Sequence, residues 1–266
     1  MSNAKRPPSW LFSLLSATVV ILWVIVAPSS VVQGQQQPPA ASQAIQSRLP
    51  SARVHALPES LNNWADTTSG GSYFDQIRPS TFGYLVWSRF PIRVYLESNS
   101  LGGGMGDRPD VRQAWSTAVQ TAISAWNTYI PLVETTVVDE ADIIIVAQAP
   151  PLRWNDGRHR AQTAETTYTL HVVTLEHGID ILQQRYRILL SPNQTSRYTT
   201  ATARHELGHA LGIWGHSRSQ TDALYYAQVS HPAPISPRDV NTLKQIYQQP
   251  TQLGWPLIGD ANVQTQ

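Results

Sequence analysis

Three residues in the stretch TARHELGHALGIWGHS, residues 202–217, have types and a spacing that could do chemistry. The alanine and leucine content of residues 199–211 predicts a helix there. His205 and His209, four residues apart, then project from one face of that helix. This spacing suits two imidazoles bound to one tetrahedral Zn²⁺ at about 2.0 to 2.1 Å. Glu206, next to the first histidine, would reach a zinc-bound water as a general base without becoming a ligand.

The residues that follow the predicted helix fit the same interpretation. Gly212 is suited to a left-handed helix exit and lets the chain turn back toward the metal, and His216 follows in a short loop. Zinc lowers the pKa of a bound water to about 7, so that a carboxylate can take its proton. The alternative is that these histidines are solvated or hydrogen-bonded polar residues, because a His-Glu-x-x-His pattern is short.

Composition limits the classes of function. The chain has 266 residues, of which 41% are hydrophobic, enough for one main domain with extra segments. A formal net charge of +1 and the absence of long like-charge runs disfavour nucleic acid and anionic membrane surfaces as partners. There is no cysteine, which excludes disulfides, thiolate ligands and a cysteine nucleophile. Any metal site must therefore use His, Asp or Glu.

The N-terminal part of the sequence is expected to direct the chain across a membrane. Residues 1–34 form a predicted signal peptide or membrane anchor, since two basic residues precede the uncharged apolar segment 10–27. Either form leaves the remainder outside the cytoplasm: secreted, periplasmic or membrane-anchored. Residues 35–83 are expected to form a low-complexity linker and a possible prosegment, or an extension wrapped on the domain.

Secondary structure becomes readable from residue 90 onward. After a strand at 90–98 and a glycine-rich turn at 102–106, Asp110 is expected to cap a helix that Pro131 ends. The apolar stripe of that helix is expected in the core: Val111, Trp115, Ala118, Ala122, Trp126 and Ile130. Further strands are predicted at 132–138, 141–148, near 166–173 and near 185–191. This order of elements predicts an α/β or α+β sheet with helices on one side.

With these elements in place, HELGHALG followed closely by another histidine resembles the zinc signature of the metzincin metallopeptidases, and most of all the matrixin-like group. The passage AWNTYIPLVETTVVDEADIIIVA upstream and ISPRDVNTLKQIYQQP downstream are similar to the same family. The downstream passage also predicts a helix with Ser236 as N-cap, Pro237 at the first position and Asp239 in a capping box. The resemblance implies a metallopeptidase domain at 84–250, with a C-terminal tail at 251–266.

The resemblance also implies a fold class. We expect an α+β, zincin-like fold: a mixed, mostly parallel twisted sheet of about five strands, a backing helix, an active-site helix and a C-terminal helix. It further implies His216 as the third ligand, although one residue more than usual separates it from Gly212. Asp222 and His231 are the competing third ligands.

Two further features of the metzincin family have expected counterparts in this sequence, a methionine turn and a tyrosine. The only methionines are Met1 and Met105, so the family's methionine turn beneath the zinc would be TDALYY, residues 221–226, with Leu224 at the methionine position. Tyr226 then falls where some metzincins place a tyrosine that assists the transition state; its alternative is a packing or rim residue.

The loop before the edge strand, where matrixins usually carry a structural zinc and a calcium, offers only Asp156, His159 and Glu165 as ligands. The family's cysteine-based latency is excluded because the chain has no cysteine.

These observations lead to two hypotheses of function. The first is a zinc-dependent endopeptidase outside the cytoplasm, in which His205, His209 and His216 hold Zn²⁺ and Glu206 is the general base. A strand near 166–173 would align an extended protein or peptide substrate by edge pairing, and we expect a monomer. The second is a noncatalytic extracellular binding or scaffold protein that keeps the metallopeptidase fold.

Overall fold

The main sheet has five strands in the order β2-β1-β3-β7-β6. The computed structural model of the chain describes residues 45–98, 108–155, 158–160, 162–175 and 178–259. The strands are β1 (Ile92–Glu97), β2 (Leu132–Glu134), β3 (Ile143–Val146), β6 (Ala164–Thr174) and β7 (Asp180–Leu190). All neighbours are parallel except β6, which pairs antiparallel with β7 along eleven residues and forms one edge of the sheet. The predicted mixed, mostly parallel sheet of about five strands is confirmed.

Two short strands lie outside this sheet, and one strand within it is shorter than predicted. β4 (Arg153–Asn155) and β5 (Arg158–Arg160) form a separate antiparallel pair. The predicted strand at 132–138 is shorter than expected: β2 ends at Glu134, and the 3-10 helix η3 (Val138–Glu140) follows.

The central strands of the sheet are fully buried at Ile92, Val94, Ile143 and Ile145. β3 carries apolar residues in succession because it lies inside a parallel sheet, whereas β1 alternates between buried and partly buried residues.

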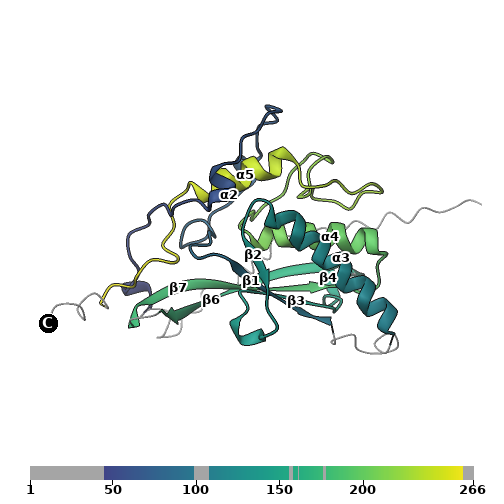
Figure 1. Ribbon diagram of the computed structural model, residues 1–266, viewed down its shortest axis with the longest axis horizontal. Helices are drawn as coiled ribbons and strands as arrows, with labels where there is room; N and C mark the ends of the chain where they lie inside the picture. Colours follow the sequence, from purple (N-terminus) through teal and green to yellow (C-terminus); the bar gives the residue numbers. More distant parts are fainter. Residues whose placement is uncertain (1–44, 99–107, 156–157, 161, 176–177, 260–266) are drawn as a thin grey trace, which may run out of the picture.

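Two long helices cover the same face of the sheet (Figure 1): α3 (Pro109–Asn127) and α4 (Ser196–Ala210). α3 buries most of the expected stripe, and also Val119 and Ile123, which the sequence analysis did not name. Val111 is only partly buried, and the buried Ile130 lies after the end of the helix. The indole Nε1 of Trp126 donates to the carbonyl of Arg204, 2.8 Å away, and so ties α3 to α4. α4 carries His205, Glu206 and His209, so α3 acts as the support of the candidate site.

The expectation that Asp110 caps α3 is wrong. The helix begins at Pro109, whose fixed φ suits the first helical position, and the N-cap residue Arg108 makes no side-chain cap. Asp110 therefore lies inside the first turn, where it accepts from the guanidinium of Arg108 at 2.6 Å. The glycine-rich turn at 102–106 lies outside the described residues.

The last helix, α5 (Pro237–Tyr247), has the predicted capping box. The hydroxyl of Ser236 accepts from the backbone N–H of Asp239 at 3.1 Å, and the Asp239 carboxylate accepts from the backbone N–H of Ser236 at 2.8 Å. Such reciprocal bonds satisfy two N–H groups that the helix itself leaves unpaired. They also fix the Asp239 carboxylate at the start of α5.

Residues 45–83, here called the N-terminal extension, pack against the rest of the domain. Besides the short helices α2 (Glu59–Asn62) and η1 (Phe74–Gln76), the extension provides three buried core side chains: Leu61, Tyr73 and Ile77. Its backbone pairs at Arg53 with Thr251. In the C-terminal segment after Thr251, Leu253 and Leu257 are buried in a second apolar cluster. Both flanks of the expected domain at 84–250 are thus packed on it.

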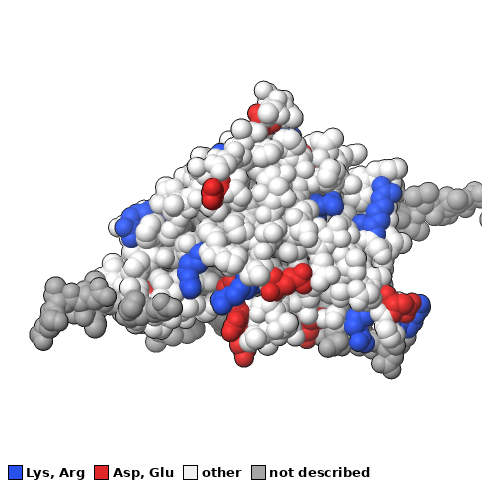
Figure 2. All heavy atoms as spheres, viewed as in Figure 1, with Lys and Arg blue, Asp and Glu red and all other residues white. Residues whose placement is uncertain are grey.

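In the part of the chain that the structure describes, no helix is long and apolar enough to cross a membrane. The apolar segment 10–27 lies outside those residues. The face of the molecule shown in Figure 2 carries basic and acidic side chains that are mixed rather than gathered by sign.

Candidate metal centre

The structure brings the three predicted histidines together. His205 and His209 lie on the last turns of α4, and His216 returns from the loop after the helix. One ring nitrogen from each lies within 4.8 Å of the others. Among the described residues this is the one group of three or more ligand-type side chains that could hold a metal ion. The three histidines are close enough to bind one ion, as the sequence predicts.

Hydrogen bonds orient the two helical imidazoles. His205 Nδ1 lies 2.9 Å from the carbonyl oxygen of Ala223, and His209 Nδ1 lies 2.7 Å from that of Ile213. A carbonyl oxygen can only accept, so each Nδ1 carries the proton and each Nε2 presents a lone pair. Such outer contacts are typical of histidines that bind a metal.

The two lone pairs face one another, since His209 Nε2 lies 3.2 Å from His205 Nε2. Neither nitrogen has a proton to donate, so the contact between neutral rings is repulsive. Two nitrogens bound to one tetrahedral zinc at 2.0–2.1 Å lie roughly 3.3–3.4 Å apart. A shared cation therefore explains both the separation and the orientation of the two rings.

Burial keeps all three imidazoles neutral at pH 7. Desolvation lowers the pKa of His205 to about 4 and that of His216 to about 3. The pKa of His209 is lowered well below its usual value by burial and by its two histidine neighbours. The neutral form is the one that binds a metal.

Two buried atoms at the site have no hydrogen-bond partner among the described residues: His216 Nε2 and Glu206 Oε1. An unpaired buried acceptor costs about 1–3 kcal/mol, so native proteins keep few of them without a reason. A metal ion for the imidazole and a water for the carboxylate would satisfy both atoms. The residues present therefore fit a bound zinc.

Glu206 is fully buried next to the edge strand. Thr166 of β6 donates its hydroxyl to Glu206 Oε2 at 2.5 Å. Burial raises the pKa of Glu206 to about 7, against the opposing effect of the Thr166 hydrogen bond. A cation at the three histidines would lower this pKa, because an opposite charge favours the carboxylate. Thr166, 40 residues before Glu206, was not foreseen from the sequence.

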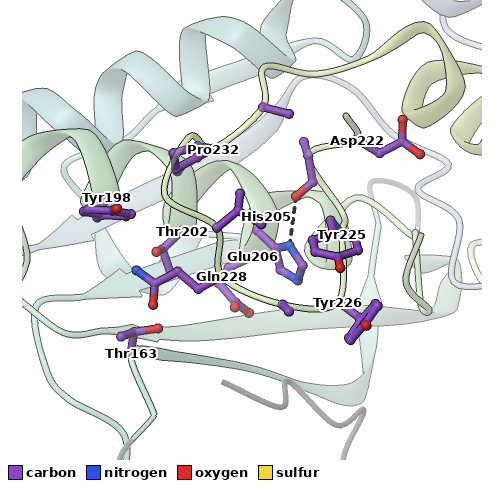
Figure 3. Close-up of a pocket in the computed structure, with 15 residues that line it drawn as sticks. Thr163, Tyr198, Thr202, His205, Glu206, Asp222, Tyr225, Tyr226, Gln228 and Pro232 are labelled. Carbon is purple, nitrogen blue, oxygen red and sulfur yellow. Dashed lines mark hydrogen bonds between the residues drawn. The ribbon is translucent and has the colours of Figure 1, made fainter. Parts of the chain in front are cut away.

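The segment predicted as the counterpart of the methionine turn lies directly beneath α4. Leu224 is fully buried, and a Cβ built on Gly208 would lie 2.6 Å from Leu224 Cδ2. The carbonyl of Ala223 in the same turn is the acceptor for His205 Nδ1 (dashed line in Figure 3). The turn thus supports the helix between its two histidines and orients one of them.

This turn is held by Asp239 from α5. Asp239 Oδ2 accepts from the backbone N–H of Ala223 at 2.8 Å, and Oδ1 accepts from the hydroxyl of Tyr73 at 2.5 Å. Tyr73 belongs to the N-terminal extension, so the extension is connected through Asp239 and the turn to His205. Neither contact is visible in a local sequence pattern, because the partners are 16 and 166 residues apart.

The competing ligands lie elsewhere. Asp222 is buried, but its carboxylate accepts from Ser236 at 2.7 Å and from Arg238 at 3.0 Å. Figure 3 shows it turned away from His205. His231 is exposed and contacts Ser230 at 3.0 Å. Neither residue joins the cluster, and His216 takes the third position despite the extra residue before it.

Of the three candidate ligands for further metals, only Glu165 has a side chain that the structure describes. Asp156 falls outside the described residues, His159 is in β5, and Glu165 is on β6. The three histidines form the one candidate metal group found there.

Two cavities flank the candidate centre. The Glu206 cavity is lined by Glu206, His205, Thr163, Tyr198 and Tyr225 among others (Figure 3). The His216 cavity is lined by residues of the loop at 214–218, which includes His216, and by Tyr168. Tyr226, whose exposed fraction is 43%, lines both. It therefore stands at the rim where the two cavities meet.

Gly212 makes the return of the chain from α4 to His216 possible. Its φ is +120°, and a Cβ there would lie 2.6 Å from the carbonyl oxygen of Leu85. We expect Gly212→Ala to lower the free energy of unfolding by about 1–3 kcal/mol. It should also weaken zinc binding roughly 10- to 100-fold, because the backbone movement that relieves the contact with Leu85 would displace His216. Urea denaturation and competition with a chelator measure the two effects.

Gly178 provides the matched control for this prediction. It also has a positive φ, +73°, but a Cβ there would meet nothing within 4 Å. Gly178→Ala should therefore show a smaller loss of stability and unchanged zinc binding. Equal effects of the two substitutions would contradict the role given to the contact between Gly212 and Leu85.

A search against models of known protein families found no match to this chain, and a search of curated proteins found no matching sequence.

Proposed function

We propose that this protein is a zinc-dependent endopeptidase of the metzincin type, with a zincin-like fold, that acts outside the cytoplasm. One observation carries the proposal. Three neutral imidazoles converge beside a buried carboxyl group whose Oε1 has no partner among the described residues. The antiparallel edge strand and the buried turn beneath α4 support the family assignment. The export signal rests on the sequence of residues 10–27.

The donor set favours zinc. Three histidine nitrogens and an open fourth position are a common arrangement in catalytic zinc sites. When bound, zinc polarises the scissile carbonyl and lowers the pKa of a water molecule to about 7. Glu206 Oε1 would take a proton from a water molecule at this site, and Glu206 would then pass the proton to the leaving amine. Thr166 holds the other carboxylate oxygen and so keeps Glu206 in one orientation during both steps.

The edge strand β6 is suited to align the substrate. Thr163, directly before β6, lines the Glu206 cavity, Tyr168 lines the His216 cavity, and Thr166 between them contacts Glu206. Five steps along a strand cover about 17 Å. An extended peptide paired with the free edge of β6 would therefore pass from one cavity to the other and across the proposed base.

A noncatalytic binding protein is the second candidate, suggested by the extra residue before His216 and the missing methionine. A noncatalytic function does not explain the buried Glu206, because a structural metal site needs no buried carboxylate beside the first ligand. Burying a carboxyl oxygen without a partner lowers stability, and a catalytic role explains why the chain keeps it.

Metal removal tests the proposal. The purified full-length protein should cleave an unfolded protein substrate, with products identified by mass spectrometry. We expect a chelator to abolish cleavage, and one equivalent of Zn²⁺ per chain to restore it. Mg²⁺ should not restore cleavage, since it prefers oxygen ligands. A zinc-loaded protein that leaves a broad set of unfolded proteins and peptides intact would contradict the proposed activity.

A further inference from the structure

The His216 cavity has a wall that the N-terminal extension supplies. Residues 76–80 form this wall, and the loop at 214–218 forms the opposite one. The two are in close contact: Arg78 N–H donates to the carbonyl of Trp214 at 3.4 Å, and a Cβ on Gly215 would lie 2.4 Å from the carbonyl oxygen of Gln76. The cavity, of about 840 Å³, is large enough for substrate side chains. The extension therefore forms part of the wall of this cavity.

The charges that line this cavity have one sign. Arg78 comes from the extension and Arg218 from the loop, and none of the described residues that line the cavity is acidic. Both arginines are exposed, and no carboxylate within the described ranges forms an ion pair with either guanidinium. Gln76, Ser80 and Ser217 add polar groups, while Tyr168 and Trp214 add apolar ring surface. An anionic group that enters would find hydrogen-bond donors and no competing carboxylate.

We propose that the His216 cavity binds an acidic side chain of the substrate, through Arg78 and Arg218. This inference rests on the proposed function and adds a substrate preference to it. A guanidinium offers a planar pair of donors that matches a carboxylate, so arginine suits this task better than a diffuse positive surface. The substrate side chain would belong to the part of the peptide on the His216 side of the scissile bond. No lysine or arginine of the described part of the chain lines the Glu206 cavity, so we expect no such preference there.

Paired peptides test the inference. Peptides with blocked termini, built around one cleavage site found in an unfolded protein, would carry Glu or Gln in turn at each of four positions on either side of the bond. We expect one or two adjacent positions, on one side only, at which Glu raises kcat/KM about fivefold to tenfold over Gln at low salt. Blocked termini ensure that a terminal carboxylate does not produce the effect. A matched series with a free C-terminus shows whether a terminal carboxylate is preferred instead.

Charge-removing variants assign the preference to the cavity. In the double variant Arg78→Gln, Arg218→Gln, the ratio of kcat/KM for the Glu peptide to kcat/KM for the Gln peptide should fall to near one. Arg89→Gln is the matched control, since Arg89 is exposed and lines neither cavity. The preference should persist in it.

The outcomes separate the inference from the proposed function. Hydrolysis of the neutral peptides without a preference for Glu at any position would overturn the inference alone. The inference alone would also be overturned if the preference for Glu survived in the double variant. The same holds if only peptides with a free C-terminal carboxylate were preferred. Failure to hydrolyse any peptide, with zinc bound, would overturn the proposed function and the inference with it.

Discussion

Glu206→Gln is expected to lower kcat/KM for peptide hydrolysis by a factor of about 10² to 10⁴, the share that a general base contributes. Glutamine has nearly the same shape, and its amide oxygen can accept the hydrogen bond from Thr166 that Glu206 Oε2 now accepts at 2.5 Å. The three imidazoles are unchanged, so zinc content should equal that of the parent protein. What is lost is the ability to take a proton from water and return it to the leaving amine.

Glu165→Gln is the control for the change in charge. Glu165 lies on β6, close enough that its charge contributes to the raised pKa of Glu206, and it lines neither cavity. This variant should keep kcat/KM within a few-fold of the parent value. A Glu206→Gln protein with full zinc occupancy and nearly full activity would remove Glu206 from the mechanism.

A chain that begins at Tyr84 is expected not to fold. It would lack Leu61, Tyr73 and Ile77, three buried members of the main core. Each such side chain contributes about 1.5–3 kcal/mol when fully buried, and whole domains are stable by only about 5–15 kcal/mol. The buried carboxylate of Asp239 would also lose the Tyr73 hydroxyl that donates to it.

Circular dichroism and thermal denaturation decide this prediction. A chain that begins at residue 45 should unfold cooperatively, whereas the chain that begins at residue 84 should show no cooperative transition. If the shorter chain unfolded at the same temperature and kept its zinc, residues 45–83 would be a removable segment. In that case the proposal that residues 76–80 form part of the substrate cleft would also need revision.

The parts of the site that were predicted from the sequence depend on short spacings. Histidines four residues apart meet on one helix face whatever the surrounding fold, and Gly212 marks the end of that helix. His216 could be named because a loop ligand needs no helical register. Its competitor Asp222 is bound to Arg238 at 3.0 Å, a contact that no spacing reveals, and His231 is exposed and lies outside the cluster.

The contacts that complete the site join residues far apart in the sequence. Thr166 meets Glu206 because β6 lies beside α4, and Tyr73 meets Asp239 because the N-terminal extension crosses α5. Residues 76–80 reach the loop after α4 for the same reason. Irregular segments such as residues 52–83 have no periodicity, so their packing is decided by tertiary contacts that single-sequence reasoning does not contain.

The sheet was more predictable than the details of its helices. Buried parallel strands such as β3 show as apolar runs, and the half-buried β1 shows as alternation. The start of α3 was placed wrongly because Asp110 is a good cap by type, whereas Pro109 sets the first helical position. β2 ends early because the chain turns into η3 four residues after Glu134.

X-ray absorption spectroscopy at the zinc edge of the metal-loaded protein is the most direct test of the central claim, that His205, His209 and His216 form one zinc centre. We predict one zinc per chain, with three imidazole nitrogens at about 2.0–2.1 Å and one oxygen ligand. The imidazole count should fall to two in His216→Ala. A parent spectrum with fewer than three imidazoles, or a protein that retains no zinc after purification and reloading, would contradict the account.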